Sequence, residues 1–437
     1  MNTIKKQVVI IGGGPGGLAA AVKLKKAGVK DILILEREHE LGGILRQCIH
    51  DGFGLTRFGE TLSGPEYAQR FIDEVRELGI EYKTDSTVIG LTADKTVTAV
   101  SRDGLAEYQA DAVILTMGCR ERTRGALAIP GERPAGVFTA GVAQTYINLK
   151  NKMVGRKVII LGSGDIGMIM ARRMTLEGAK VKAVFEIQPY PSGLPRNIEQ
   201  CLNDYNIPLY LSHTVTDIKG HHRLESVVVS QVDEKLNPIP GTEKEYECDT
   251  LILSVGLIPE NELSLMAGVE LDPRTKGAVV DEFCQTTVPG IFAAGNVLHV
   301  HDLVDFVSLE AEKMAMGVVK YVEAGVTAES ESANAGKLVE TESETTVFGL
   351  AQAEISVETG GFVGYTVPQK ITGEADVVLS FRPRKPMRDQ YVDVYQGDVL
   401  VASKKYVKLL PAEMEKITVP ASKLTSGATV KVVTRDE

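Results

Sequence analysis

The chain has 437 residues, a net charge of −10, and 43% hydrophobic with 24% charged residues, which is an ordinary globular composition. Its length predicts two to four domains, and its acidic balance argues against a nucleic-acid partner, because no basic excess is present to neutralise phosphates. No apolar run approaches the roughly 18–20 residues of a membrane span, and early glycines interrupt the first apolar run. We therefore expect a soluble protein without a membrane span or targeting segment.

The cysteines are scattered and form no CxxC or CxxxxC pair. This pattern excludes a redox dithiol built from neighbouring cysteines, and it gives no support for a closely spaced zinc or iron–sulfur site. We predict no metal site. Scattered, unpaired cysteines suit a reducing compartment, so we expect a cytoplasmic protein. The five positions are Cys48, Cys119, Cys201, Cys248 and Cys284.

The chain opens with a strand, a glycine turn and a helix. Lys6–Ile11 is a β-branched run typical of a buried parallel strand. Leu18–Ala27 has helical propensity and ends at Gly28, a residue type that often caps helices. Ile32–Leu35 is the next predicted strand, which completes one βαβ unit.

The same layout returns some 150 residues later, with a strand over Lys157–Leu161, a helix over Ile166–Glu177 and a strand over Lys180–Phe185. A second βαβ unit at that distance indicates a duplicated nucleotide-binding fold.

Between the two units the pattern predicts strands. A small antiparallel meander is expected over Thr87–Leu91, Thr96–Ser101 and Leu105–Gln109, with Asp103-Gly104 as a hairpin turn. Ala112–Thr116 is predicted to return to the first sheet.

The last hundred residues differ in character. Residues 323–346 are rich in Glu, Ser, Ala and Thr, a composition typical of a linker. Beyond them, alternating or β-branched runs between turns predict a C-terminal β-sandwich with an interaction or capping role. The strands predicted there are Val377–Phe381, Tyr391–Tyr395, Val399–Tyr406, Lys416–Val419 and Thr429–Thr434.

The first motif is a GxGxxG turn between a strand and a helix. Gly12 permits the tight turn, Gly14 lets the backbone approach a pyrophosphate, and Gly17 allows close packing of helix on strand. Glu36, at the end of the next strand, can accept hydrogen bonds from ribose hydroxyls. The helix N-terminus attracts phosphates, so this corner predicts a dinucleotide site. Its further predicted contact residues are Pro15 and Arg37.

The second motif repeats this spacing with Gly162 and Gly164, and with Glu186 as the acid at the strand end. A carboxylate there repels a 2′-phosphate, so NAD(H) is favoured over NADP(H). The alternative is a retained fold that has lost its ligand or serves another purpose. Asp165 and Ile166, which open the helix, complete the predicted contacts.

A third segment, Thr286 to Asn296, reads as a turn and a buried strand that ends in Gly295-Asn296. Two further strand-end glycine turns lie at Thr116-Met117-Gly118 and Ser254-Val255-Gly256, and Thr116, Gly118 and Gly256 are predicted to contact a cofactor. Taken in this order, the segments over about residues 6–322 resemble the two-dinucleotide-binding-domain flavoproteins of the pyridine nucleotide–disulfide oxidoreductase superfamily.

The resemblance implies FAD at the first corner and a nicotinamide dinucleotide at the second. It places Gly42 and Gly43 near the FAD pyrophosphate, Val88 beside adenine, and Gly295 with Asn296 on the ribityl side. Asn296 departs from the aspartate usual in the family and makes the flavin side one charge less negative.

The redox disulfide of the family is missing, since Ile44 to His50 holds Cys48 alone. Disulfide reduction of the usual kind is therefore not expected.

Narrower likenesses concern Gly43 to Gly54, Gly118 to Arg122 and His299 to Asp305. These segments look like flavoprotein subunits related to the α subunit of sarcosine oxidase, to hydrogen cyanide synthase, and to oxidoreductases found beside glycerol-3-phosphate dehydrogenases in bacteria. Such relatives imply an oligomer in which a second flavoprotein, an iron–sulfur subunit or a small acceptor exchanges electrons with this chain.

The candidate catalytic groups are Cys48, His50 and His301. The first two follow the Gly42-Gly43 turn and could tune the flavin or relay a proton, or could be a buried small hydrophobe and a histidine satisfied by backbone. His299 and His301 follow the Gly295-Asn296 turn, near the place of the flavin pyrimidine ring in the family. Asp302 is a candidate N-cap for a helix that begins near Val304.

The sequence thus predicts an α/β protein with two Rossmann-like dinucleotide-binding domains and a C-terminal all-β sandwich. The function predicted is hydride transfer between NAD(H) and FAD. One alternative is a subunit of an FAD-dependent amine, amino-acid or hydroxy-acid (for example glycerol-3-phosphate) dehydrogenase complex, and another is a non-catalytic flavin-containing scaffold. The predicted boundaries are 1–120 with 280–322 (FAD), 121–279 (nicotinamide dinucleotide), 323–346 (linker) and 347–437 (sandwich).

Overall fold

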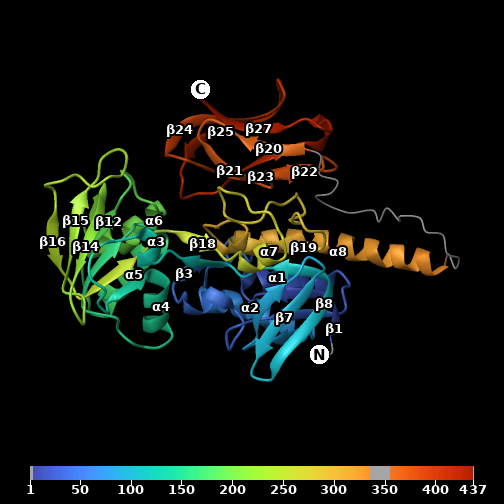
Figure 1. Cartoon of the computed structure of the whole chain (residues 1–437). Coiled ribbons are helices and arrows are strands. Elements are labelled where there is room, and N and C mark those ends of the chain that lie inside the picture. Colours follow the sequence, from blue (N-terminus) through green and yellow to red (C-terminus); the bar gives the residue numbers. More distant parts are fainter. Residues whose placement is uncertain (1–2, 335–354, 437) are drawn as a thin grey trace. The chain divides into compact units, whose positions relative to one another are not determined.

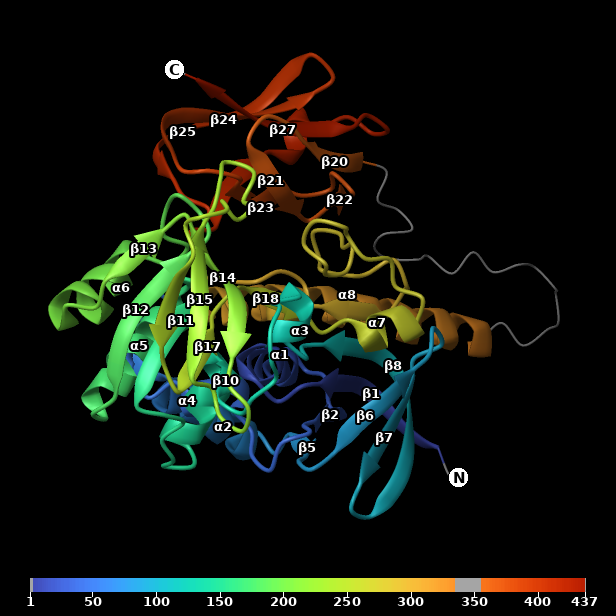
Figure 2. The same ribbon diagram turned by 60° about the vertical axis from the view of Figure 1, so that its left-hand side comes forward.

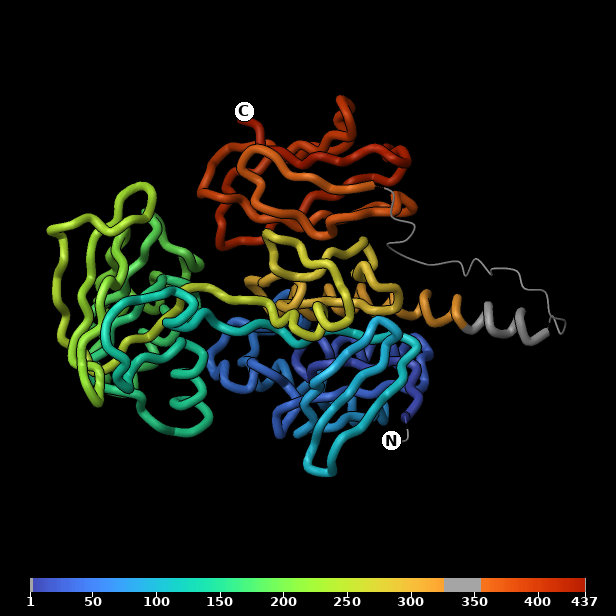
Figure 3. The backbone as a smooth tube through the Cα atoms, viewed as in Figure 1, coloured from blue at the N-terminus to red at the C-terminus, as the bar shows by residue number. Residues whose placement is uncertain are grey.

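The computed structural model describes residues 3–334 and 355–436, which divide into two compact units. One unit comprises residues 1–119 with 259–437, and the other comprises residues 120–258. Figure 3 traces the path of the chain, which leaves the first unit after Cys119 and returns at Pro259. No helix in the described ranges is both long and apolar enough to cross a membrane.

The N-terminal part of the first unit is built on one large sheet. Among the described residues, seven strands form it in the order β5-β2-β1-β8-β7-β6, with β19 paired to β8. The strands are β1 Ile4–Ile11, β2 Ile32–Leu35, β5 Glu81–Lys83, β6 Thr87–Leu91, β7 Thr96–Ser101, β8 Gly104–Leu115 and β19 Ile291–Ala293.

Helices and short elements complete this part of the unit. Leu18 of α1, Phe71 of α2 and Met314 of α8 are buried in one core with the strands. Figure 1 labels these three helices. The elements are α1 Pro15–Lys26, η1 Gly43–Gln47, β3 Asp51–Phe53, β4 Leu62–Ser63, α2 Gly64–Glu77, α7 Glu262–Met266, η3 Gly295–Val297 and α8 Val304–Asn334.

The second unit carries the repeated βαβ pattern. Its parallel sheet has the order β10-β17-β11-β12-β13, and β14, β15 and β16 form an antiparallel sheet beside it (Figure 2). The strands are β9 Cys119–Glu121, β10 Val137–Thr139, β11 Lys157–Leu161, β12 Lys180–Glu186, β13 Leu209–Leu211, β14 His213–Lys219, β15 Ser226–Gln231, β16 Lys244–Glu247, β17 Thr250–Leu253 and β18 Leu257–Pro259. The helices are α3 Arg124–Leu127, α4 Ala140–Asn148, α5 Asp165–Leu176, α6 Pro195–Cys201 and η2 Asn203–Tyr205.

The C-terminal part of the first unit is a β-sandwich. Its sheets have the orders β22-β20-β27-β24-β25 and β21-β23-β26, and side chains from both sheets share one core. Along β23, Val377, Leu379 and Phe381 are fully buried while Val378 is exposed, the alternation of a strand with one face on the core. The elements are β20 Ile355–Thr359, β21 Val363–Val367, β22 Lys370–Ile371, β23 Val377–Pro383, β24 Met387–Gln396, β25 Val399–Leu409, β26 Glu415–Val419, η4 Ala421–Lys423 and β27 Val430–Asp436.

The fold class predicted from the sequence is confirmed, but three expectations about elements are wrong. The meander strand and the returning strand are one strand, β8, whose first half pairs with β7 and whose residues 108–115 pair with β1. Helix α8 extends to Asn334, so residues 323–334 of the expected linker are helical; residues 335–346 lie outside the described ranges. The sandwich also contains β20, β21 and β22, which were not expected.

Candidate functional site

The first glycine corner joins β1 to α1, and its geometry requires glycine. Gly12 has φ +108°, and a Cβ there would lie 2.5 Å from the carbonyl oxygen of Thr116. A Cβ on Gly17 would lie 1.9 Å from the carbonyl oxygen of Gly12. Pro15 is the first helical residue, where its missing N–H costs no hydrogen bond. The hydroxyl of Thr116, a predicted contact residue, donates to the carbonyls of Ile11 and Gly12. These hydrogen bonds hold the backbone at the start of the turn.

Glu36 is buried and held in one orientation at this corner. It is 6% exposed; one carboxylate oxygen accepts the Gly13 N–H at 2.7 Å and the other accepts the Glu38 N–H at 2.9 Å. Each oxygen keeps a lone pair that could accept a ribose hydroxyl. The neighbouring Arg37 side chain is exposed and points to Glu38.

Glycine backbone forms the front of the turn. A Cβ built on Gly14 would meet only the Cα of Gly43, at 3.8 Å, so the backbone is open on this side. Gly42 donates its N–H to the Gly13 carbonyl, and Gly43, with φ +55°, packs against Gly14. Val88 lies on β6, beyond residues 83–86, which hydrogen-bond to residues 36–38. The residues present therefore fit an adenine dinucleotide such as FAD.

The second corner repeats the glycine turn and the buried acid of the first. Gly162 has φ +96°, and its Cβ would lie 2.0 Å from the Ser254 carbonyl oxygen. Glu186, 3% exposed, accepts the N–H groups of Ser163 and Gln188, both at 2.9 Å, as Glu36 accepts those of Gly13 and Glu38. The gap between turn and acid is 23 residues in both corners.

The second corner differs by two serine hydroxyls that the sequence motifs did not indicate. Ser163 Oγ and Ser192 Oγ donate to the same oxygen of Glu186, at 2.7 and 2.6 Å. Asp165 accepts the Leu194 N–H and the Asn197 amide, so the loop after β12 closes on the start of α5. A constant offset of 150 positions relates Gly42-Gly43 to Ser192-Gly193, and this offset is the pattern that could have drawn attention to Ser192.

The remaining predicted contact residues lie at strand ends. Gly118 and Gly256 both adopt positive φ, and their carbonyls accept the N–H groups of Glu260 and Arg122 respectively. Gly164 is the N-cap of α5, and Ile166 lies in its first turn.

The Gly295-Asn296 turn follows β19. The Asn296 side-chain oxygen accepts the His301 N–H at 2.9 Å, and its amide points to the sulfur of Cys119 at 3.7 Å. The turn itself is tied to α8, because the Gly295 N–H donates to Glu310 at 2.7 Å.

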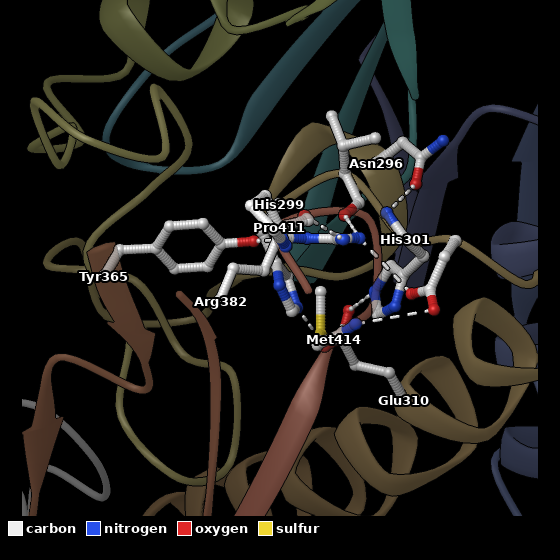
Figure 4. A network of polar contacts seen from close by, with 10 residues as sticks. Asn296, His299, His301, Glu310, Tyr365, Arg382, Pro411 and Met414 are labelled. Carbon is white, nitrogen blue, oxygen red and sulfur yellow. Dashed lines mark hydrogen bonds and ion pairs between the residues drawn. The ribbon is translucent and has the colours of Figure 1, made fainter. Parts of the chain in front are cut away.

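A buried cluster of two histidines and a glutamate lies beside this turn (Figure 4). The Nε2 atoms of His299 and His301 lie 2.6 and 3.1 Å from the Glu310 carboxylate, and the two side chains are 1% and 4% exposed. Burial lowers the pKa of His299. The charge interactions and hydrogen bonds of His299 and His301 outweigh burial at Glu310 and hold the pKa of its carboxyl well below the usual value.

Ligand atoms of this cluster lie within 4.8 Å of one another, close enough to consider a metal. Histidine ligands of metals almost always donate their other ring N–H to an acceptor. Among the described residues, the buried Nδ1 atoms of both histidines have no hydrogen-bond partner. This observation favours Nε2–H groups that donate to Glu310 over metal coordination.

The other two candidate catalytic residues contact different neighbours. The Cys48 thiol donates to the Ile44 carbonyl, and burial raises its pKa to about 12, which favours the protonated thiol. His50 Nδ1 contacts the Asp51 carbonyl at 3.0 Å, and the ring packs against Phe53. All five cysteines lie in the described residues, and none of them forms a disulfide.

The expectation that Asp302 caps α8 is wrong. The helix begins at Val304, which places Leu303 at the N-cap position. Asp302 instead accepts hydrogen bonds from Arg382 at 3.2 Å and from the Met414 N–H at 3.4 Å. Its ion pair with the sandwich replaces the expected role.

Several known proteins are similar to this chain in sequence. The chain is 27% identical over 350 residues to the glutamate synthase [NADPH] small chain of Mycobacterium tuberculosis, covering 72% of this chain and 66% of the relative. It is 28% identical to hydrogen cyanide synthase subunit HcnB of Pseudomonas protegens, covering 66% and 65%. The matches thus span slightly less than two thirds of these relatives.

Solved structures agree. Thioredoxin reductase of T. acidophilum has 25% identity and a TM-score of 0.60, with coverage of 73% of this chain and 99% of the other. The family model for pyridine nucleotide-disulphide oxidoreductases matches residues 6–326. This chain therefore belongs to the pyridine nucleotide-disulphide oxidoreductase family, whose members are NAD(P)H-dependent flavoprotein oxidoreductases.

Proposed function

We propose that this chain binds FAD at the first glycine corner and NAD(H) at the second, and passes electrons onward to a partner subunit or a small acceptor. The flavin supplies the redox chemistry by accepting a hydride from the reduced nicotinamide. The observation that carries the proposal is the duplication of the corner, including the buried acid that accepts two backbone N–H groups in each copy.

The protein supplies orientation at both corners. Glu36 and Glu186 cannot rotate without breaking their bonds to backbone N–H groups, so each would present a fixed carboxylate to a ribose. The first turns of α1 and α5 direct N–H groups to the place of the phosphates.

A preference for NAD(H) over NADP(H) follows from Glu186. Its carboxylate is buried and fixed at the strand end, where a 2′-phosphate would bring two more negative charges. Within the described part of the chain, its hydrogen-bond donors are the backbone and two serines, and none is a basic side chain.

We also propose that the chain is not a dithiol disulfide reductase. Cys48 is the one cysteine between Gly42 and His50, and its raised pKa opposes a thiolate at neutral pH. Cys48, His50 and His301 remain candidates for tuning the flavin or relaying a proton.

A second function is favoured by the serines of the second corner. Ser163 and Ser192 occupy one oxygen of Glu186, which a ribose would have to share. A corner closed in this way would suit a subunit of an amine, amino-acid or hydroxy-acid dehydrogenase complex that does not use nicotinamide. Relatives named as subunits, such as HcnB and an opine oxidase subunit of Agrobacterium tumefaciens, give this alternative its context.

The Glu186→Ala variant separates the two functions. If NADH reduces the bound flavin, this variant should slow anaerobic flavin reduction by NADH at least about tenfold, since a charge-assisted hydrogen bond is lost. Glu177→Ala, at the exposed end of α5, is the matched control and should react as the wild type does. Equal reduction rates in wild type and Glu186→Ala would remove the nicotinamide role of the second corner.

A further inference from the structure

One arginine of the sandwich reaches the loop that follows the Gly295-Asn296 turn (Figure 4). Arg382, on β23, donates from Nη2 to the Val300 carbonyl at 3.1 Å and to Asp302 at 3.2 Å. Its other nitrogens donate to the hydroxyl of Tyr365 at 3.2 Å and to the Pro411 carbonyl at 3.0 Å. The guanidinium thus joins two parts of the sandwich to residues 300–302.

These contacts are shielded from water. The Arg382 side chain is 15% exposed and that of Asp302 is 10% exposed. In such surroundings a charge left without its partner is costly, so the pair holds its geometry firmly. The four hydrogen bonds of Arg382 depend on the rigid, planar guanidinium, which a lysine cannot reproduce.

The loop from Leu298 to Leu303 depends on side-chain contacts. It belongs to no strand or helix. Val300, whose carbonyl Arg382 holds, lies between His299 and His301 in the chain. Both imidazoles bond to Glu310, and the His301 N–H bonds to Asn296. Displacing Val300 would therefore strain both histidine bonds and the Asn296 contact at once.

Glu310 completes the connection to the turn. The same carboxylate that accepts from the two histidines accepts the Gly295 N–H at 2.7 Å. A continuous set of hydrogen bonds thus runs from Arg382 through residues 299–302 to Glu310 and to the Gly295-Asn296 turn.

We propose that Arg382 is a positioning residue for the flavin: by holding Val300 and Asp302 it keeps the Gly295-Asn296 turn in the geometry that binds the ribityl side. The sandwich is then part of the flavin site and not an appended docking module. This inference rests on the proposed FAD site at the first unit.

The test compares full-length variants by their flavin dissociation constant and by the visible spectrum of bound flavin. Arg382→Met removes the hydrogen bonds while keeping the length of the side chain, and Asp302→Asn removes the charge while keeping the shape. Each should weaken FAD binding roughly tenfold or more and change the bound-flavin spectrum, the size expected when a buried charged hydrogen bond is lost. Arg382→Lys should restore the wild-type values only in part.

Arg388→Met is the control, because Arg388 lies on the exposed face of β24 in the same sandwich. Thermal unfolding of every variant shows whether the fold persists. If Arg382→Met does not fold, Asp302→Asn and Glu310→Gln decide the question.

The outcomes separate two failures. A wild-type chain that binds no FAD would contradict the proposed function. A wild type that binds FAD, with folded Arg382→Met and Asp302→Asn variants of unchanged affinity and spectrum, would overturn the positioning role of Arg382 and leave the proposed function standing.

Discussion

At each glycine corner, a single buried carboxylate ties the turn to the end of the following strand. Glu36 and Glu186 accept backbone N–H groups at 2.7 to 2.9 Å, and the two sets of bonds correspond one to one. The difference lies in Ser163 and Ser192, whose hydroxyls supplement the second carboxylate, whereas the first has glycines at the equivalent positions, Gly13 and Gly42. Whether these hydroxyls leave room for a ribose on Glu186 distinguishes the two functions proposed for the second corner.

The Ser192→Ala variant tests whether this hydroxyl competes with a ribose. If it does, its removal frees one hydrogen-bonding position on Glu186, and the KM for NADH should fall about fivefold, corresponding to about 1 kcal/mol. Steady-state kinetics with NADH measures the change, and Ser101→Ala, in the β7 strand of the other unit, serves as the control. A rise in KM would mean instead that Ser192 itself bonds the ribose.

His299 makes the stability of the chain depend on pH. Because burial lowers its folded-state pKa below 6.5, the unfolded chain binds a proton at that site more readily than the folded chain. The stability this group contributes is therefore fully present above pH 6.5 and is lost as pH falls below it, by up to about 1.4 kcal/mol per pH unit. Glu310, with its lowered pKa, adds a similar loss below its unfolded value of 4.5.

Denaturant unfolding at a series of pH values, for wild type and His299→Gln, isolates this effect. Asp281, whose pKa burial raises to about 7, acts in the opposite direction, but it is present in both proteins and cancels in the difference. The variant should be less stable at pH 8, and the difference in unfolding free energy between wild type and variant should shrink as pH falls from 6.5 to 5. A difference that stays constant over this range would show that His299 does not titrate as its burial requires.

At the scale of elements, the close approach of α1 to β1 depends on one glycine. A Cβ on Gly17 would overlap the Gly12 carbonyl, which is backbone and cannot move aside cheaply. We expect Gly17→Ala to cost at least about 3 kcal/mol of stability and to abolish FAD retention. Gly325→Ala is the contrasting substitution: a Cβ there meets nothing within 4 Å, and α8 should gain up to about 1 kcal/mol.

Calorimetric or denaturant unfolding of both glycine variants checks this pair of expectations. Tolerance of Gly17→Ala with normal flavin content would mean that the helix does not pack on the turn as described.

The elements that could be predicted from the sequence are those with strong local patterns. Thr87–Leu91, Thr96–Ser101 and Lys157–Leu161 have the predicted bounds because β-branched runs end at clear turns. The sequence predicts a break at residues 110–111 of β8, because alanine and aspartate are poor strand formers, but pairing with β1 continues the strand through them. The Glu- and Ala-rich start of the expected linker is also a good helix-forming composition, so α8 continues into it.

The same distinction between local patterns and long-range contacts applies to the residues of the candidate site. The glycines and acids of both corners were predictable because they act within one βαβ unit at fixed spacing. The contact between Arg382 and Val300 joins residues 82 positions apart, and the bond of Ser192 to Glu186 depends on how a loop closes. Neither leaves a periodic pattern in one sequence.

At the scale of the whole molecule, the sandwich has its own core yet is bonded to the N-terminal part of its unit. The Val280 backbone is hydrogen-bonded to Gln369 and Lys370, and the Glu282 carboxylate accepts hydrogen bonds from Thr372. Val367 is buried in the core of the large sheet. The sandwich is therefore an integral part of the first unit.

A chain that ends at Asn334 tests this conclusion. It should still fold, since the large sheet and the second unit have their own cores, but it should hold FAD at least about tenfold more weakly than the full chain, because the bonds of Arg382 are gone. Flavin titration followed by fluorescence measures the affinity. Equal FAD affinities of the truncated and full-length chains would mean that the sandwich has a docking or capping role alone.

The measurement that bears most directly on the whole account is anaerobic titration of the purified chain with NADH, after its flavin content has been determined. We expect one FAD per chain, and we expect NADH to bleach the visible flavin band at concentrations at which NADPH leaves it largely unchanged. A chain that carries no flavin, or a bound flavin that neither nicotinamide reduces, would contradict it.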